Sequence, residues 1–177
     1  MQALTTTFHY SADGKHRLST TRIWGNPDAP RPLWIGHNPS GATKVGDGKT
    51  RLRIIHFCRR WQEPGFDLGN LYPFEDPDPA VCRDLAACAE GTVFQENLDH
   101  LATMSVQASR IVACFGNARD QAWVNRVFAQ IARVRPGMPV YCLGVTMKDA
   151  PKHPLARGRY RVPDDQQPVL WRTLAGG

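Results

Sequence analysis

The sequence lacks the paired cysteines of a typical metal site. It has five cysteines, and no two of them form a Cys-x-x-Cys motif, the spacing that zinc and iron–sulfur sites commonly use. Cys114 and Cys142 stand inside apolar, strand-like runs, so we expect them to be small core residues. The other three are Cys58, Cys82 and Cys88. We therefore predict no metal and no cofactor.

A long apolar run and a signal peptide are also missing. A membrane-spanning helix needs about 20 consecutive apolar residues, and no run in this chain approaches that length. Residues 1–5 lack the basic segment and following apolar stretch that mark a signal peptide. We therefore expect a soluble, cytoplasmic protein without a membrane partner.

No repeat, low-complexity tract or linker divides the chain. Its length of 177 residues is usual for one domain, and a hydrophobic fraction of 42% is enough for a core. This composition argues against a disordered protein. We expect one domain over residues 1–177 and favour a monomer.

Acidic residues are too few to balance the basic ones, and the net charge at pH 7 is +6. Such an excess attracts polyanions such as nucleic acids. Arginines cluster within residues 51–60 and 157–161, and this clustering favours a nucleic-acid partner. The alternative is a basic surface with no role in nucleic-acid binding.

Short apolar runs alternate with stretches of helical periodicity, the patterns of buried strands and of helices facing a core. The predicted strands are 22–24, 33–36, 66–71, 111–115 and 140–143. The predicted helices are 52–61, about 80–108, 122–134 and a terminal one at 165–174. The alternation predicts one three-layer α/β/α domain with a mainly parallel central sheet.

A polar turn that can do chemistry follows the strand at 33–36. In open α/β folds, ligands bind beyond the carboxyl ends of the strands, and here the chain continues as His37-Asn38-Pro39-Ser40. An Asn amide can hold and orient a water molecule, and His37 can act as an acid, a base or a hydrogen-bond donor. The alternative is an Asn-Pro turn in which Asn38 bonds only the local backbone.

Two further strand ends carry candidate residues. Asn70 ends the strand at 66–71, close to Tyr72 and Phe74. An amide can read the edge of a nucleobase, and aromatic rings can stack on its face. The alternative is that both aromatic residues belong to the core and Asn70 caps a turn.

His153 follows the strand at 140–143 within Lys152-His153-Pro154-Leu155. A histidine there can donate a hydrogen bond to a developing oxyanion. The arginines that follow, Arg157, Arg159 and Arg161, can hold phosphates. The alternative is a solvated basic loop.

Gly48-Lys49-Thr50 looks like the end of a P-loop, but that motif requires glycine where Thr43 stands, so we reject it.

These motifs, in this order, resemble those of the uracil-DNA glycosylase superfamily. Residues 36–40 are closest to the Gly-x-Asn-Pro form of its mismatch-specific branch, and 70–79 are similar to the Asn-led, Pro-rich segment of its thermostable branch. Residues 111–117 resemble its apolar strand ending in Gly, and 152–155 its last motif, usually His-Pro-Ser. The chain also resembles an uncharacterised bacterial and phage family, a domain of unknown function, over most of its length and more specifically.

The glycosylase resemblance implies a role for each motif. Asn38 positions the attacking water, Asn70 reads a flipped base, and His153 stabilises charge on the departing base. Leu155 or Arg157 lies where the superfamily inserts a wedge into the duplex. The remaining expected base or turn contacts are Gly36, His37, Pro39, Ser40, Tyr72 and Phe74. The remaining expected DNA contacts are Lys49, Arg51, Arg53, Lys152 and Arg159, with Arg59 and Arg60 as further phosphate contacts.

The chain also departs from the superfamily pattern. Leu155 stands where Ser is usual, and Asn38 stands where other branches carry Asp. An amide cannot take a proton as a carboxylate does, so Asp47 is a candidate substitute acid or base. The glycine-rich loop at 41–48 can admit a larger, modified pyrimidine.

We therefore predict a monofunctional DNA glycosylase. It hydrolyses the N-glycosidic bond of a flipped pyrimidine and leaves an abasic site, in DNA repair or in defence against modified phage DNA. Two alternatives stay open. One is a hydrolase or transferase acting on free nucleotides, and the other is a nucleic-acid-binding module without catalysis.

Overall fold

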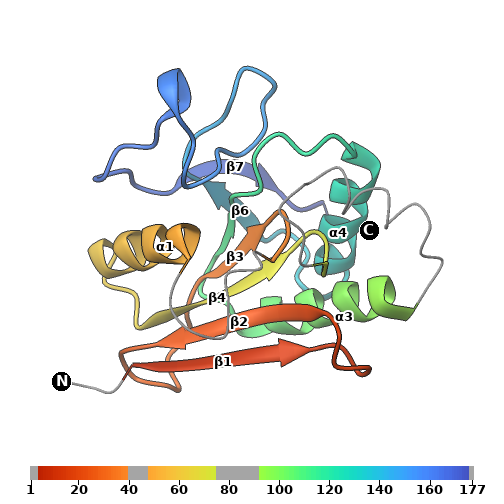
Figure 1. The fold of residues 1–177 in the computed structure, drawn as a ribbon. Helices are drawn as coiled ribbons and strands as arrows, with labels where there is room; N and C mark the ends of the chain where they lie inside the picture. Colours follow the sequence, from red (N-terminus) through yellow and green to blue (C-terminus); the bar gives the residue numbers. More distant parts are fainter. Residues whose placement is uncertain (1–3, 40–47, 75–91, 176–177) are drawn as a thin grey trace.

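The computed structural model describes residues 4–39, 48–74 and 92–175. Its centre is a seven-stranded sheet in the order β1-β2-β4-β3-β5-β6-β7 (Figure 1). The strands are β1 Thr5–Tyr10, β2 Arg17–Ile23, β3 Leu33–Gly36, β4 Gly65–Asn70, β5 Ile111–Ala113, β6 Pro139–Cys142 and β7 Val169–Thr173. The helices are α1 Lys49–Arg60, α3 Thr92–Gln107 and α4 Gln121–Val134, with a 3-10 turn, η1, at Gly158–Tyr160.

The sheet is mixed, so the prediction of a mainly parallel sheet was wrong. The four central strands, β4, β3, β5 and β6, pair in parallel. The β1–β2 hairpin joins β4 antiparallel, and β7 joins β6 antiparallel. Antiparallel strands can follow each other through a short turn, whereas parallel neighbours need a crossover. The β1–β2 hairpin uses such a turn, whereas β7 follows β6 through the long connection 143–168; β1 and β7 form the two edges of the sheet.

The predicted terminal helix at 165–174 was also wrong, because this segment contains β7. Residues 169–173 include Val, Trp and Thr, which favour a strand, and they pair with β6. The Trp171 ring packs edge-on against Phe115 and Phe128. Strand β1 was not predicted at all, because its alternating polar residues are mostly exposed.

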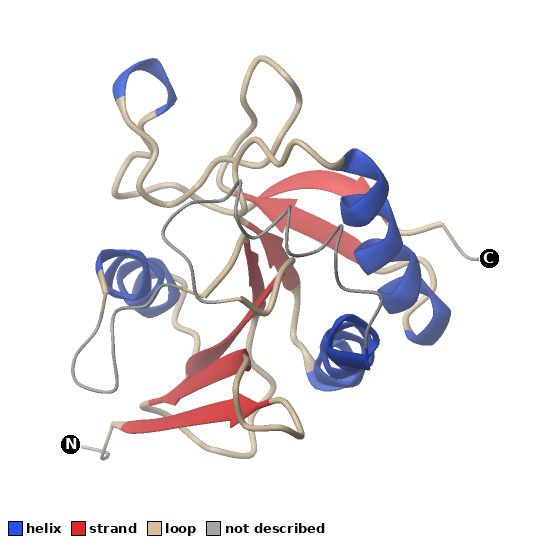
Figure 2. Cartoon of the chain, turned by 45° about the vertical axis from the view of Figure 1, so that its right-hand side comes forward, coloured by secondary structure: helices blue, strands red, loops and turns tan. Residues whose placement is uncertain are grey.

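Helices cover both faces of the sheet (Figure 2). The side chains of β3 show why, since Leu33 and Ile35 pack with residues of α3 and α4, while Trp34 packs with residues of α1. Successive strand residues point to opposite faces, so both faces of β3 are buried. Apolar positions three or four residues apart on α4 face the sheet, and Asp120 caps this helix by accepting a hydrogen bond from the Trp123 N–H at 2.9 Å.

The α1 side of the core is built from stacked aromatic rings. The Trp34 and Trp61 ring centroids are 5.4 Å apart with an interplanar angle of 4°. Cys58 and Cys114 lie in the same cluster, and burial raises the pKa of both thiols well above the usual range. Cys142 is buried as well. The prediction that Cys114 and Cys142 are core residues is confirmed.

Three of the predicted helices are confirmed wholly or in part by α1, α3 and α4. The part of the predicted helix 80–108 before residue 92 lies outside the described residues. No helix in the described ranges combines the length and the apolar character needed to span a bilayer.

Two residues of α1 test this packing. Ile54 is fully buried against the sheet, whereas Leu52 on the same helix is 53% exposed. We expect Ile54→Ala to lower the free energy of unfolding by about 2–5 kcal/mol, because it leaves a cavity. We expect Leu52→Ala to change it by less than about 0.5 kcal/mol. Urea unfolding of both variants measures the difference, and equal losses would contradict the assigned burial of α1.

Candidate active site

The ends of β3 and β4 come into close contact at the carboxyl edge of the parallel strands. Their register pairs Gly36 with Asn70. A Cβ atom on Gly36 would lie 2.7 Å from the Asn70 Oδ1 atom, so only glycine fits there without movement of the Asn70 amide. Asn70 is only 6% exposed. The first and second sequence motifs therefore meet.

The contact continues beyond the strands. The Leu71 N–H donates to the Gly36 carbonyl at 2.9 Å, and the Tyr72 N–H donates to the His37 carbonyl at 3.0 Å. The His37 and Tyr72 rings are 5.2 Å apart between centroids. Tyr72 is 1% exposed and Phe74 is 9% exposed, both within the core on the α3 and α4 side. Their burial favours the alternative that both are core residues.

The Asn38 side chain is held in one orientation. Its Nδ2 atom donates long hydrogen bonds to the carbonyls of Pro39 and Phe74, at 3.4 and 3.5 Å. Its Oδ1 atom therefore faces the Nδ1 atom of His37, 3.2 Å away. A carboxamide oxygen only accepts hydrogen bonds, so Nδ1 of His37 carries the proton. In the neutral ring, Nε2 is then the acceptor.

Burial lowers the pKa of His37, and the hydrogen bond with Asn38 opposes this only in part. Burial therefore favours the neutral form of the ring. The site holds an uncharged imidazole whose protonated nitrogen is fixed by its neighbour.

His153 reaches the same edge from the segment after β6. Gly116, just after β5, donates its N–H to the Pro151 carbonyl at 3.0 Å. A Cβ atom on Gly116 would lie 3.6 Å from the His153 Cβ atom. Burial lowers the pKa of His153, and the neighbouring His37 lowers it further. The third sequence motif thus joins the first two.

The proton of His153 has the opposite placement. The Leu155 N–H donates to the Nδ1 atom of His153 at 3.1 Å. A backbone N–H cannot accept, so Nδ1 is unprotonated and the neutral ring carries its proton on Nε2. His153 is therefore a donor through Nε2, as the sequence hypothesis requires.

Two predicted DNA contacts on α1 are engaged elsewhere. Arg51 is 5% exposed, and its guanidinium lies over the Phe8 ring at 5.7 Å. Arg53 donates to the Val162 carbonyl at 2.7 Å, pairs with Asp164 at 2.5 Å and lies over the Phe57 ring. Both arginines contribute to packing in this structure.

Two side chains of α1 and the side chain of its C-cap residue, Trp61, bind one C-terminal segment, residues 162–166. Besides Arg53, His56 contacts the Asp164 carbonyl through Nε2 at 2.9 Å, and Trp61 donates from Nε1 to the Gln166 carbonyl at 3.1 Å. We call residues 162–166 the C-terminal strap.

Other predicted contacts lie on the surface. Lys49, Arg157 and Arg159 are exposed, Leu155 is 38% exposed, and Lys152 is half-buried with its side chain beside Gly144. Pro39 is buried, and Ser40 and Asp47 lie outside the described residues.

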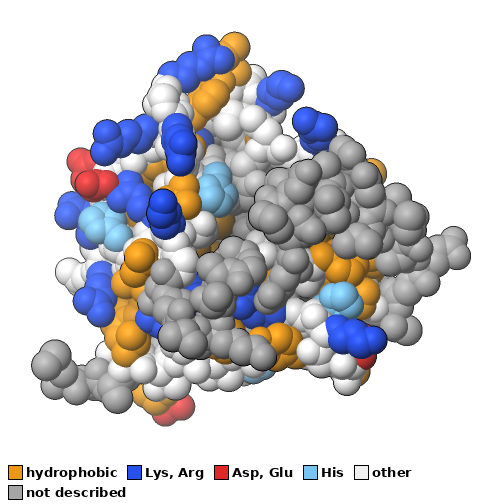
Figure 3. Space-filling view, viewed as in Figure 1, with side chains coloured by type: hydrophobic (Ala, Val, Ile, Leu, Met, Phe, Trp, Pro, Cys, Tyr) orange, Lys and Arg blue, Asp and Glu red, His pale blue; other side chains and the backbone are white. Residues whose placement is uncertain are grey.

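A cavity of about 430 Å³ is lined by Arg53, Arg157, Arg161 and Leu155, among others. Figure 3 shows Lys and Arg side chains gathered over the upper loops, where Figure 1 places the connection from β6 to β7.

Two residues that the sequence hypothesis missed hold the end of β4. Asn97 is fully buried in α3 and donates from Nδ2 to the Asn70 and Leu71 carbonyls, at 3.1 and 3.3 Å. Trp123 donates from Nε1 to the Leu71 carbonyl at 2.8 Å. A lone Asn in a helical stretch has no sequence signal that distinguishes such a role.

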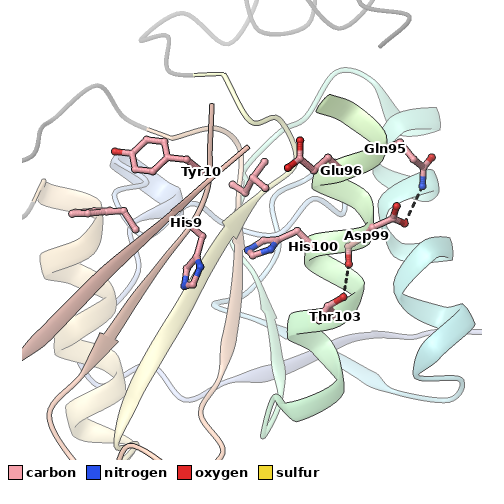
Figure 4. Close-up of a pocket in the computed structure, with 9 residues that line it drawn as sticks. His9, Tyr10, Gln95, Glu96, Asp99, His100 and Thr103 are labelled. Carbon is pink, nitrogen blue, oxygen red and sulfur yellow. Dashed lines mark hydrogen bonds between the residues drawn. The ribbon is translucent and has the colours of Figure 1, made fainter. Parts of the chain in front are cut away.

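A second cavity, of about 800 Å³, lies between β1 and α3. In Figure 4, the His9 and His100 side chains lie near each other, with ring centroids 5.6 Å apart, and Nε2 of His100 is 2.8 Å from the Ser19 hydroxyl. Ser19 is 1% exposed, so a substrate cannot reach it as a nucleophile. No three His, Cys, Asp or Glu side chains within the described ranges are grouped to hold a metal ion.

Residues 17–155 match a protein family described as Protein of unknown function (DUF1643). The chain belongs to this family. The matched range contains Asn38, Asn70 and His153, and it confirms the resemblance to a domain of unknown function. No curated protein and no solved structure matches the chain.

The two arginines with different surroundings give a test. We expect Arg53→Ala to lower the free energy of unfolding by about 1–2 kcal/mol, because it removes a charged donor to the Val162 carbonyl and a ring contact. We expect Arg157→Ala, an exposed position, to change it by less than about 0.5 kcal/mol. Thermal and urea unfolding measure both, and an unchanged stability of the Arg53 variant would contradict its structural role.

Proposed function

We propose that this protein is a DNA glycosylase that hydrolyses the N-glycosidic bond of an extruded pyrimidine, natural or modified. The observation that carries the proposal is that the segments holding Asn38, Asn70 and His153 lie at one edge of the sheet, with His37 near enough to His153 to lower the pKa of His153. These residues come from three separate motifs, and the resemblance to the uracil-DNA glycosylase superfamily gives each one a role.

The proton on Nε2 of His153 supports this chemistry. When the N-glycosidic bond breaks, negative charge develops on the departing pyrimidine, and a fixed donor stabilises such charge. A neutral imidazole can donate from Nε2 while Nδ1 accepts from the Leu155 N–H. Asn70, almost fully buried beside Gly36, offers a carboxamide for hydrogen bonds to the base edge.

The charge distribution supports DNA rather than a free nucleotide as the substrate. The exposed arginines at 157, 159 and 161 follow His153 directly, and Lys148 is exposed in the preceding loop. Several basic side chains beside the site can bind the DNA backbone phosphates on both sides of the target nucleotide. Arg51 and Arg53 are not part of this proposal, because both are engaged in packing.

Activity on modified DNA tests the proposal. Duplexes carrying uracil, mismatched thymine or hypermodified cytosine are incubated with the protein, and alkali then cleaves any abasic site. We expect strand breaks on at least one duplex, and a rate about 10²–10³-fold lower for His153→Ala, because one charge-stabilising donor is lost.

His9→Ala is the matched control, since His9 is exposed on β1; it should retain the wild-type rate. Turnover of free nucleotides without DNA cleavage would support the small-molecule alternative. DNA binding without breaks on any duplex would support a non-catalytic module. Either outcome would overturn the proposed function.

A further inference from the structure

We propose that His37 is the general base of this site and that Asn38 is the residue that positions it. The inference rests on the proposed function for its substrate. It reverses the expected roles of the two neighbours, since the sequence hypothesis gave the attacking water to Asn38 and offered Asp47 as the substitute base.

The hydrogen bonds of Asn38 indicate that it orients the His37 ring. An amide oxygen is a poor proton acceptor, so Asn38 cannot replace a carboxylate as a base. The two carbonyls at its Nδ2 atom, from Pro39 and Phe74, turn its Oδ1 atom toward Nδ1 of His37. Asn38 thereby fixes the ring so that Nε2 keeps its lone pair.

The charge state of the ring supports the base assignment. A base must be unprotonated at the working pH, and burial of His37 favours the neutral imidazole. Among the described residues, the groups that face it are Tyr72 from the end of β4, Asn38 and the neighbouring His153. None of these is a carboxylate that would stabilise the imidazolium.

His153 cannot take the same role. Its Nδ1 atom accepts the Leu155 N–H, and its Nε2 atom carries the proton. The two histidines therefore present opposite functions, an acceptor on His37 and a donor on His153. Hydrolysis of a base–sugar bond is accelerated by one of each, because the water gives up a proton while the leaving base takes up charge.

The reaction balances with these two groups. Nε2 of His37 takes a proton from water as the water oxygen forms a bond to C1′ of the sugar. The bond from C1′ to the pyrimidine N1 breaks, and its electron pair moves onto the base, where the Nε2 hydrogen of His153 stabilises it. His37 then returns its proton to the departing base through solvent, which leaves a neutral base and an abasic site.

Two measurements test the proposal. Nitrogen-15 NMR of the histidine rings reports the tautomer of each ring without any substrate, and we expect the proton on Nδ1 of His37 and on Nε2 of His153. The pH dependence of cleavage is then compared between wild type and His37→Gln. The wild-type rate should fall as pH drops through the pKa of His37, because imidazolium cannot accept a proton.

His37→Gln should lower the cleavage rate by about 10²–10⁴-fold. It should also remove the acidic limb of the pH–rate profile, that is, the fall in rate at low pH. Asn38→Asp should move the limb to higher pH, because a carboxylate favours the imidazolium. His9→Gln is the matched control and should change neither rate nor limb.

The outcomes separate this proposal from the proposed function. If wild-type protein cleaves no substrate, the proposed function fails. A proton on Nε2 of His37 overturns the base assignment whatever the substrate is. Cleavage by His37→Gln within twofold of wild type, with the limb kept, overturns it as well while leaving the proposed function in place.

Discussion

The candidate site depends on the close parallel pairing of β3 and β4 where both strands end. Because residue 36 is glycine, the Asn70 amide can lie directly against the neighbouring backbone. The pairing then continues through the Leu71 and Tyr72 N–H groups, so the residues after both strands leave the sheet side by side. A side chain at position 36 would separate the two motifs that supply the polar groups.

Support from α3 and α4 completes this arrangement. Asn97 and Trp123 both donate to the Leu71 carbonyl, which lies just beyond β4. Buried carbonyls need such donors. The turn after β4 is thus held on one side by the Asn97 and Trp123 side chains and on the other by the carbonyls of Gly36 and His37. These hydrogen bonds fix the backbone beneath the candidate site.

The sequence predicted the central elements well, because β3, α1 and α4 carry strong apolar periodicity. It also placed Asn38, Asn70 and His153 after strands whose carboxyl ends share an edge, and their joint role around one base stays a prediction. It missed β1 and β7, two short edge strands whose residues are largely exposed. The engagement of Arg51 and Arg53 follows from contacts distant in sequence, which a pattern of spacing does not contain. The proton positions of the two histidines follow from local hydrogen-bond geometry, within one or two residues of each ring, and residue spacing does not specify that geometry.

The C-terminal strap affects which parts of the molecule unfold together. Arg53 and His56 of α1 and Trp61 at its C-cap bind the strap, and residues 158–161 connect the strap to the segment that carries His153. Elements joined in this way tend to unfold locally as one cooperative unit. We therefore expect the backbone amides of α1 and of the strap to exchange together, and a protease cut within 158–161 to loosen α1, although the two lie far apart in the sequence.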